Sequence, residues 1–509
     1  MIGAALAAIL LTLPAVAPAD LTEKAVLPSP GGSPSSDGVL TLPSPGNPLI
    51  AVRFVFRVGS QHDPKGKEGL AALTAAMVAE GGSKTVSYEQ LLEKFYPMAA
   101  GLDAACRKEV TVFSGTIHRD NLRPYLALVS EVLVAPRFAE KDFERLRNEA
   151  IDAVSKTLRA TNDEELSKWT LQCELYADHP YGHYDRGTVT ALRAMTLDDV
   201  KAFHSRHYTR ESLLVGLAGG FEPTTIEALE EGLKPLRTSG FELPELPQPK
   251  APRGLEVTII EKPAEATAIA LGFPLPLTRR DDDFYALMVA NSYLGEHRTF
   301  NGKLMQELRG KRGLNYGDYS YIEDFIQDGS STFAVPNNPR RQQYFSIWIR
   351  PVPRDKAVFA LRAALWELDK LLRVGISPAD FEETRSFLLN YSRLWVQTPS
   401  RNLGYAIDGK LYGRQSLVAE LAERLPRLTL EEVNAAARKY LQPGGMKVAI
   451  VAQNAAELRE ILTSNQPTPI HYDTEGTPEE VLAEDQKIAV FPLQDVRVRI
   501  VPVEQMFER

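Results

Sequence analysis

The most informative segment of this 509-residue chain is FRVGSQHDPKGKEGLAALTAAM, residues 56–77. It starts where an apolar strand pattern ends in a Gly-Ser pair, and it continues through a polar turn to Gly69. From there the side chains of Leu70, Leu73 and Met77 recur at the three- and four-residue spacing of a packed helix. The helical part, GLAALTAAMVAEGG, is rich in alanine and holds almost no side chain that could do chemistry.

The composition is that of a soluble globular protein, with 44% hydrophobic and 24% charged residues. A chain of this length is too long for one ordinary core, so we expect about two to four domains. The formal net charge of −8 argues against a nucleic-acid partner, because such a partner would require a basic face.

Residues 1–19 are predicted to be a secretory signal peptide. The run is small and apolar, has no charged residue between Ile2 and Ala19, and ends in an A-x-A-like site before Asp20. The alternative is an uncleaved membrane anchor, for which the run is barely long enough. We therefore expect bacterial export to the periplasm or the medium, and no membrane association after cleavage.

The chain has two cysteines, Cys106 and Cys173. Two are too few for a disulfide framework or a thiolate metal site. The sequence leaves open whether they form one bridge or remain two buried free thiols.

Proline-rich stretches divide the chain. Residues 20–39 form a first linker, and LPELPQPKAPRG, residues 243–254, forms a second one that lacks apolar periodicity. The predicted units are an N-terminal domain over residues 40–242, a C-terminal domain over residues 255–465 and a tail over residues 466–509.

The two halves repeat each other. TLDDV at Thr196 is matched by TLEEV at Thr429, and both are capping boxes at a helix start. The same spacing separates the strand patterns LLVGLAGG and MKVAIVAQ, and the helical patterns DFERLR and DFEETR recur in the same order. Each half opens with apolar alternation, at residues 49–58 and 255–262, which is typical of a half-buried strand. We predict an α+β fold with helices on one face of each sheet.

The frame of the opening stretch resembles the pitrilysin/insulysin family of zinc peptidases, the inverzincins, together with the mitochondrial processing peptidase and its bacterial relatives. Two further motifs resemble the same family: HPYGHYDRGT, residues 179–188, and LMQELRGKRGLNYG, residues 304–317. The resemblance covers both halves and leaves the tail outside. It implies two homologous α/β-roll halves, each a mostly antiparallel sheet with helices on one face, that form a clam shell. The frame residues are Arg57, Gly59, Ser60, Asp63, Gly69, Leu70, Ala71 and Met77.

Active members of this family carry H-x-x-E-H in the helix of the opening stretch. Residues i and i+4 share a helix face, so two imidazoles can bind one zinc ion, and the Glu beside them takes a proton from zinc-bound water. Here the two His positions are Ala72 and Ala76, and the Glu position is Ala75. The resemblance places the third metal ligand at Glu149, which we interpret as a solvated or salt-bridged remnant. We expect no metal and no catalytic residue in this chain.

No other histidine pair replaces the missing ligands. His204 and His207 lie one helical turn apart, and His179 and His183 flank Pro-Tyr-Gly. Neither pair has an acidic partner at helical spacing, so we interpret both as structural.

In the second half, the resemblance implies a substrate-binding pair at Arg309 and Tyr316. In active members the corresponding side chains lean across the cavity toward the zinc. A guanidinium can donate two hydrogen bonds to peptide carbonyls, and a phenol can donate to a developing oxyanion. Arg312 is the alternative to Arg309. The spacing alone, without the family frame, would favour a helix-end Arg and a half-buried strand Tyr with no function.

This division of residues favours a zinc-free subunit of a heteromeric metallopeptidase. A homologous subunit with H-x-x-E-H would bring the zinc, and this chain would supply Arg309 and Tyr316 to a shared cavity that binds a peptide substrate. The alternative is a catalytically inactive family member that acts as a peptide-binding or structural scaffold. The three alanines argue against an autonomous metallopeptidase.

Overall fold

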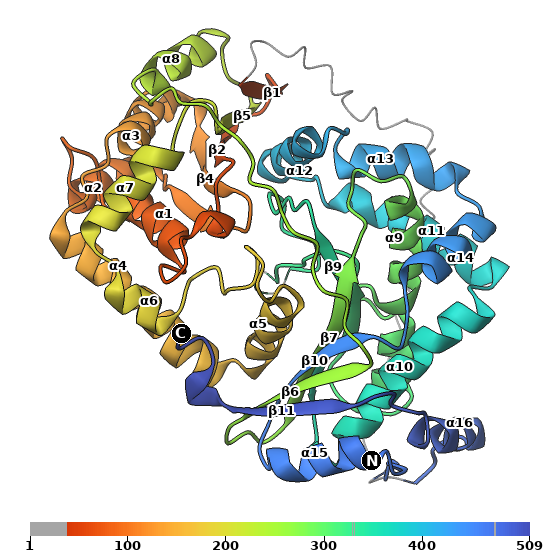
Figure 1. Cartoon of the computed structure of the whole chain (residues 1–509). Coiled ribbons are helices and arrows are strands. Elements are labelled where there is room, and N and C mark those ends of the chain that lie inside the picture. The colour runs from red at the N-terminus through yellow and green to blue at the C-terminus, as the bar shows by residue number, and fades with distance from the viewer. Residues whose placement is uncertain (1–37, 328, 330, 473–474) are drawn as a thin grey trace, which may run out of the picture.

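The computed structural model describes residues 38–327, 329, 331–472 and 475–509. The expected signal peptide and nearly all of the first linker lie outside these residues. The chain folds into two halves that face each other, drawn from red to yellow and from green to blue (Figure 1). Among the helices of the described ranges, none is long and apolar enough to cross a membrane.

The first half is built on a 5-stranded sheet with the order β1-β5-β2-β4-β3. β1 and β5 run parallel, whereas the other neighbours are antiparallel. The strands are β1 (Val39–Pro43), β2 (Leu49–Phe56), β3 (Asp103–Cys106), β4 (Thr111–His118) and β5 (Leu213–Gly219).

The second half repeats this arrangement in a 6-stranded sheet with the order β11-β6-β10-β7-β9-β8. The order β6-β10-β7-β9-β8 corresponds to β1-β5-β2-β4-β3, and β11 is added outside β6. The predicted duplication is therefore present in the topology. The strands are β6 (Leu255–Glu261), β7 (Thr267–Leu275), β8 (Asp318–Tyr321), β9 (Gln343–Val352), β10 (Met446–Ala452) and β11 (Arg497–Pro502).

The topology corrects one detail of the predicted repeat. The patterns at residues 49–58 and 255–262 predict that these two strands are equivalent, but β6 corresponds to β1 and not to β2. β1 has 5 residues, so its alternation is too short to stand out beside the linker. Its partner β5 lies far along the chain, and a local pattern does not reveal that pairing.

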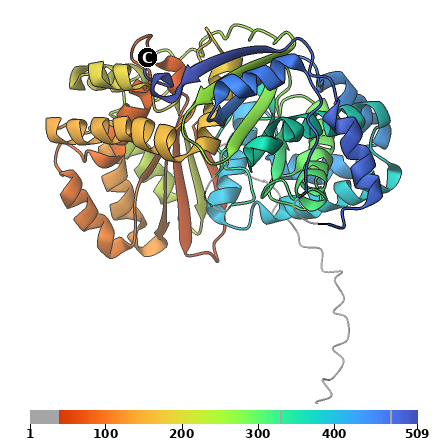
Figure 2. The ribbon, with the colours of Figure 1, turned by 90° about the horizontal axis from the view of Figure 1, so that it is seen from below.

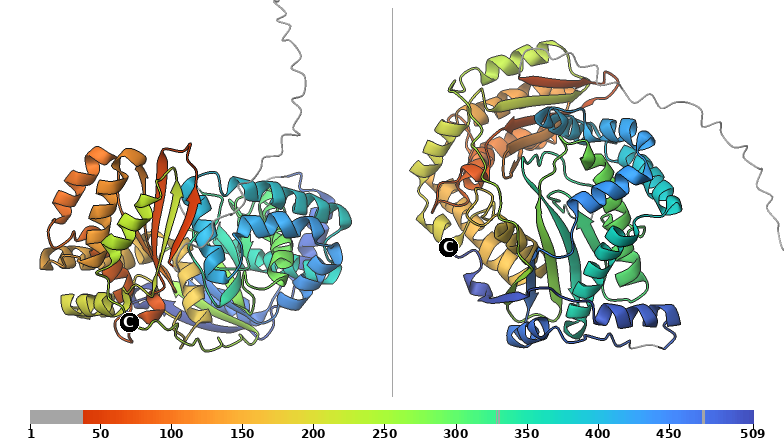
Figure 3. Two further views of the ribbon diagram at one scale, coloured as in Figure 1. Left: turned by 90° about the horizontal axis from the view of Figure 1, so that it is seen from above. Right: turned by 45° about the vertical axis from the view of Figure 1, so that its right-hand side comes forward.

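Helices cover the outer face of each sheet (Figure 3). The predicted capping boxes are present, because Thr196 caps α7 with Asp199 and Thr429 caps α14 with Glu432. The helices of the first half are α1 (Leu70–Glu80), α2 (Tyr88–Phe95), α3 (Leu122–Val134), α4 (Glu140–Asp152), α5 (Asp163–Leu175), α6 (Val189–Ala194), α7 (Leu197–His207) and α8 (Thr224–Leu233). Those of the second half are α9 (Asp283–Gly295), α10 (Ala357–Val374), α11 (Pro378–Leu394), α12 (Pro399–Tyr412), α13 (Leu417–Arg424), α14 (Leu430–Tyr440), α15 (Ala455–Ser464) and α16 (Glu479–Ala489).

The inner face of each sheet is covered by a helix from the opposite half. In β7, Ile269 and Leu271 join the core of the second half, whereas Ala268 and Ala270 point the other way. These two small side chains let α5, from the first half, pack on β7 and β10. Conversely, α12 from the second half packs on β2 and β5 of the first half, where Leu403 is fully buried. The halves are therefore interlocked through α5 and α12.

Polar contacts also join the halves. Arg53 on β2 donates to Oδ1 of Asn337 at 2.7 Å and to the Ser400 carbonyl at 3.0 Å. Lys262 Nζ lies 2.6 Å from a carboxylate oxygen of Asp163. Because these groups are partly or wholly removed from water, loss of one partner leaves the other unsatisfied.

The tail is integrated into the fold. α16 packs on α10, and β11 pairs in parallel with β6. The chain then leaves the second half, and its C-terminus lies beside α6 in the first half (Figures 1 and 2).

Candidate functional site

A cavity of about 590 Å³ lies between the two halves. One wall comes from α1, β3 and α4, and the opposite wall comes from α5, the loop at residues 324–327 and β9. Ala72, Ala75 and Ala76 all line this cavity. The three positions that carry the metal-site motif in active relatives therefore face the space between the halves.

The frame residues hold the start of α1. The side chain of Asp63 is fully buried and accepts hydrogen bonds from the backbone N–H groups of Gly69 and Ala71, both at 2.7 Å. Its third contact is Nε2 of His183 at 3.0 Å. Gly69 has a φ of 96°, and a Cβ there would lie 2.7 Å from the Arg186 carbonyl. The frame thus has a structural task that does not require a metal.

The cavity wall does not fit a zinc ion at these positions. Methyl groups have no lone pair for a metal, and Ala75 cannot accept a proton from water. Glu149 lines the cavity, but its carboxylate lies 3.2 Å from Arg145, which also contacts Glu80 at 3.3 Å. A single carboxylate paired with a guanidinium is not a ligand set for zinc.

The histidines lie in other surroundings. The rings of His62 and His207 are 5.3 Å apart, and Nε2 of His204 lies 3.1 Å from the Leu133 carbonyl. His179 accepts a hydrogen bond from the Tyr181 backbone at 2.9 Å. Burial lowers the pKa of each of the first three, His62, His207 and His204, to about 4. None of the residues that line the cavity is a histidine.

Cys106 and Cys173 are both free thiols. Cys106 lines the cavity, and Cys173 lies on α5. Burial raises the pKa of both thiols, that of Cys173 to about 12, so both are protonated at neutral pH.

β3 gives the cavity a free sheet edge. Among the described strands it pairs only with β4, and Ala104, Ala105 and Cys106 line the cavity. An extended peptide can add to such an edge through main-chain hydrogen bonds. The small side chains of β3 leave room for that approach.

The structure brings Arg309 and Tyr316 together, but outside this cavity. Arg309 lies on the π-helix η5 (Met305–Gly310), and its Nη1 donates to the Tyr316 carbonyl at 3.1 Å. The guanidinium lies 5.0 Å from the ring centre of Phe300 and 5.7 Å from that of Tyr316. Tyr316 is 76% exposed and Phe300 is 66% exposed. Neither member of the predicted pair lines the cavity, so the predicted reach across it is not seen in this arrangement.

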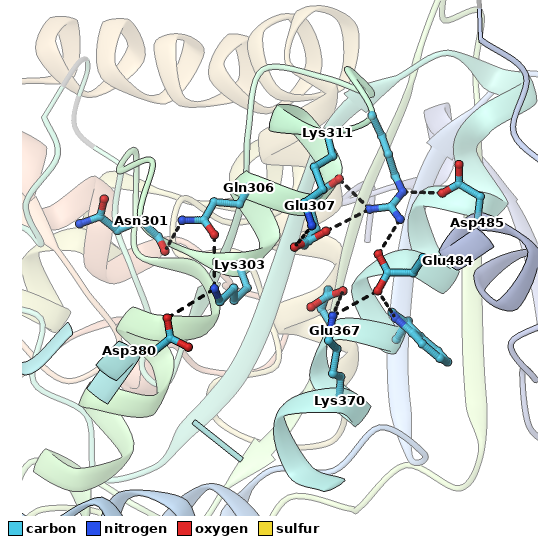
Figure 4. A network of polar contacts seen from close by, with 12 residues as sticks. Asn301, Lys303, Gln306, Glu307, Lys311, Glu367, Lys370, Asp380, Glu484 and Asp485 are labelled. Atoms are coloured by element: carbon cyan, nitrogen blue, oxygen red, sulfur yellow. Dashed lines mark hydrogen bonds and ion pairs between the residues drawn. The ribbon is translucent and has the colours of Figure 1, made fainter. Parts of the chain in front are cut away.

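Arg312, the alternative to Arg309, has a structural environment. Its side chain is fully buried and forms ion pairs with Glu307 at 3.3 Å, Glu484 at 2.8 Å and Asp485 at 2.7 Å. Glu484 and Asp485 belong to α16, so the tail holds the segment that carries Arg309 (Figure 4).

The same cluster contains three carboxylates, of Glu307, Glu367 and Glu484, whose oxygens lie within 4.8 Å of one another. Lys370 lies 3.1 Å from Glu484 and 3.6 Å from Glu367 (Figure 4). Arg312 pairs with Glu307 and also with Glu484. Burial raises the pKa of Glu367 to about 7. Against the effect of burial, hydrogen bonds from Arg312 and Lys370 lower the pKa of Glu484 to about 2. Each of the three acids has a cationic partner, so this is an ion-pair network.

Sequence reasoning missed the far wall of the cavity. Gln172 Nε2 donates to Oδ1 of Asp324 at 2.8 Å, which joins α5 to the second half. The ammonium of Lys168 lies 3.9 Å from the ring centre of Trp348. No local motif marks these residues, because they meet only when the halves come together.

Two family models match the chain in order. Insulinase (Peptidase family M16) matches residues 39–182, and Peptidase M16 inactive domain matches residues 194–388. Together they cover more than half of the chain. The chain belongs to the M16 peptidase family. The alanine positions lie in the first matched range, and Arg309 and Tyr316 lie in the second. With its ligand and base positions replaced, this M16 chain is of the inactive type.

Some curated relatives of the M16 chain are named zinc proteases, and one is named a non-peptidase homolog. An uncharacterized zinc protease of Mycobacterium tuberculosis is 26% identical over 349 residues, which are 67% of this chain and 74% of the relative. The uncharacterized zinc protease YmxG of Bacillus subtilis is 23% identical over 77% of this chain and 90% of the relative. A Helicobacter pylori relative, 22% identical over 80% of this chain and 89% of its own length, is named non-peptidase homolog YmxG.

Solved structures share the M16 fold of this chain. A peptidase M16 inactive domain from Pseudomonas fluorescens matches with a TM-score of 0.70 and 24% identity, over 82% of this chain and 95% of that one. A protease from Helicobacter pylori matches with a TM-score of 0.69 and 17% identity, over 81% and 96%. The predicted fold of two paired halves is confirmed.

Proposed function

We propose that this M16 chain is the zinc-free subunit of a heteromeric metallopeptidase. A homologous subunit with H-x-x-E-H brings the zinc, and this chain contributes Arg309 and Tyr316 to the binding of a peptide substrate. The proposal fits an exported protein whose two chains meet in the periplasm or outside the cell.

The environment of Arg309 and Tyr316 carries this proposal. Both side chains lie away from the alanine-lined cavity of their own chain, so they serve no site there. The guanidinium makes one hydrogen bond, to the Tyr316 carbonyl, and has further donors to offer. The Tyr316 ring is largely exposed. A cation and a phenol in this state are available to a peptide held by another subunit.

A second candidate function is a peptide-binding scaffold without a catalytic partner. The observation that favours it is the free edge of β3 in the alanine-lined cavity, where an extended peptide can pair in register with the sheet. In that case Arg309 and Tyr316 have no functional role.

A peptide-hydrolysis assay with mixed subunits tests the proposal. The partner is the homologue from the same organism that carries H-x-x-E-H, and the chains are assayed separately and together. We expect hydrolysis above the partner's own level only in the mixture. Arg309→Ala and Tyr316→Phe should each lower kcat/KM of the mixture about tenfold or more, because each removes a donor to the substrate.

Lys311→Ala is the matched control, because Lys311 lies in the same segment and pairs with Glu307 at 2.8 Å. It should leave the rate within about twofold, as expected for a half-exposed ion pair. An active mixture that tolerates both Arg309→Ala and Tyr316→Phe would remove the proposed roles. If mixing the subunits does not increase hydrolysis, and this chain alone binds peptide measurably, the scaffold function is favoured.

A further inference from the structure

The last residues of the chain form a strap between the halves. This C-terminal strap comprises β11, the 3-10 helix η8 (Val503–Gln505) and the final four residues. It lies beyond both ranges matched by the M16 models, which end at residue 388. Figure 2 shows it leaving the second sheet and ending on the first half.

One end of the strap is fixed to the second half. β11 pairs in parallel with β6 over its whole length, from Arg497 opposite Glu256 to Pro502 opposite Glu261. α15 also contacts β11. This end therefore moves with the second sheet.

The other end is docked on the first half. The backbone N–H groups of Val189 and Thr190 donate to the carbonyls of Phe507 and Glu508 at 3.0 and 2.9 Å. The Phe507 ring is buried, with its centre 5.5 Å from that of Tyr184. Phe507 has a φ of 53°, a conformation that a phenylalanine keeps only where surrounding contacts impose it.

Ion pairs complete the docking. Nη2 of Arg159 lies 2.8 Å from a carboxylate oxygen of Glu508, and Arg193 lies 3.9 Å from the other oxygen. The Arg159 Nε–H donates to the Met506 carbonyl. Backbone, aromatic and charged contacts thus converge on the same short segment.

The docked end touches elements that form the cavity. Tyr184, against which Phe507 packs, lines the cavity. Arg159 lies on the π-helix η4 (Ala153–Thr161), whose first residue, Ala153, also lines it. From the second half, Lys262 holds the end of the same π-helix, donating to the Arg159 carbonyl at 2.8 Å.

We propose that the C-terminal strap is a clasp that, together with α5 and α12, holds the two halves against each other beside the cavity. It pins η4 and α6, which adjoin one wall of the cavity, to the second sheet. A cavity of about 590 Å³ is of the size that holds a small ligand, so parting of its walls widens the space for a polypeptide. Undocking of the strap permits this widening. The proposal does not depend on a zinc-bearing partner.

Cys106 provides a direct readout, because this residue lines the cavity and its buried thiol is not bonded to Cys173. In a Cys173→Ser background, a chromogenic disulfide reagent reports Cys106 alone. Phe507→Ala removes the buried ring, and Glu508→Lys reverses the charge next to Arg159. We expect each to raise the labelling rate about tenfold or more, because each removes contacts that stabilise the docked strap.

Glu504→Lys is the control, since Glu504 is an exposed residue of the same strap. It should leave the labelling rate within about twofold, as usual for a surface substitution. Urea unfolding of each variant separates opening of the cavity from global unfolding. Equal labelling of all variants, or acceleration that only follows the loss of global stability, would overturn the proposal.

Discussion

Arg312→Ala is expected to lower the free energy of unfolding by about 3–5 kcal/mol. The Arg312 side chain is fully buried and is the shared partner of Glu307, Glu484 and Asp485. Its removal takes the buried cation away from three carboxylates and leaves Glu307 and Glu484 with only their lysine partners. Breaking one side of a buried pair costs more than the pair contributes. Urea denaturation at neutral pH measures the change.

The neighbouring Lys311→Ala should cost less than about 1 kcal/mol, because Lys311 is about half exposed and, within the part of the chain that the structure describes, pairs only with Glu307. Comparing the losses of stability of these two variants separates the effect of the buried ion-pair network from that of a surface charge. Equal, small effects of both substitutions would show that the tail does not anchor the segment that carries Arg309. A drop of several kcal/mol for Lys311→Ala as well would assign the effect to the local fold of the segment.

Asp63→Ala should lower the free energy of unfolding by about 2–4 kcal/mol. Asp63 accepts two backbone N–H groups at the start of α1 and contacts His183, and all three partners lose their acceptor. Burial raises the pKa of this carboxyl, although the hydrogen bonds oppose that effect. The Asp63 frame position thus stabilises the start of a helix whose metal-site positions are alanines.

Glu149→Ala is the comparison for Asp63→Ala, because Glu149 is exposed and pairs with Arg145 one helical turn away. We expect a change below about 1 kcal/mol in thermal or urea unfolding. A large loss for Glu149→Ala would mean that the remnant position is still needed for folding. A negligible loss for Asp63→Ala would mean that the frame no longer supports α1.

Features with local signals were predictable from the sequence. The capping boxes at Thr196 and Thr429 begin helices α7 and α14, and the strand patterns that follow them are β5 and β10. These signals depend on residues three or four positions apart, so they survive without knowledge of the fold. Features that depend on distant contacts were not predictable. They include the equivalence of β1 and β6, the exchange of α5 and α12 between the halves, and the C-terminal strap.

The same distinction between local sequence signals and distant contacts applies to the candidate site. The positions of Ala72, Ala75 and Ala76 followed from helical spacing inside a recognisable frame, and they line the cavity. The surroundings of Arg309 and Tyr316 could not be predicted from the sequence, because they depend on a π-helix and on the ion pairs of Arg312 with α16. The far wall around Asp324 comes from the other half and has no signature in the sequence.

We propose that this M16 chain keeps the frame of the metal site but binds no zinc, because its ligand positions are Ala72 and Ala76. The most direct measurement is the zinc content and peptidase activity of the purified chain after equilibration with zinc, beside its H-x-x-E-H homologue treated identically. We predict roughly one zinc per chain for the homologue and no stoichiometric zinc or hydrolysis for this chain. One bound zinc per chain, with peptide hydrolysis that a chelator abolishes, would contradict the account.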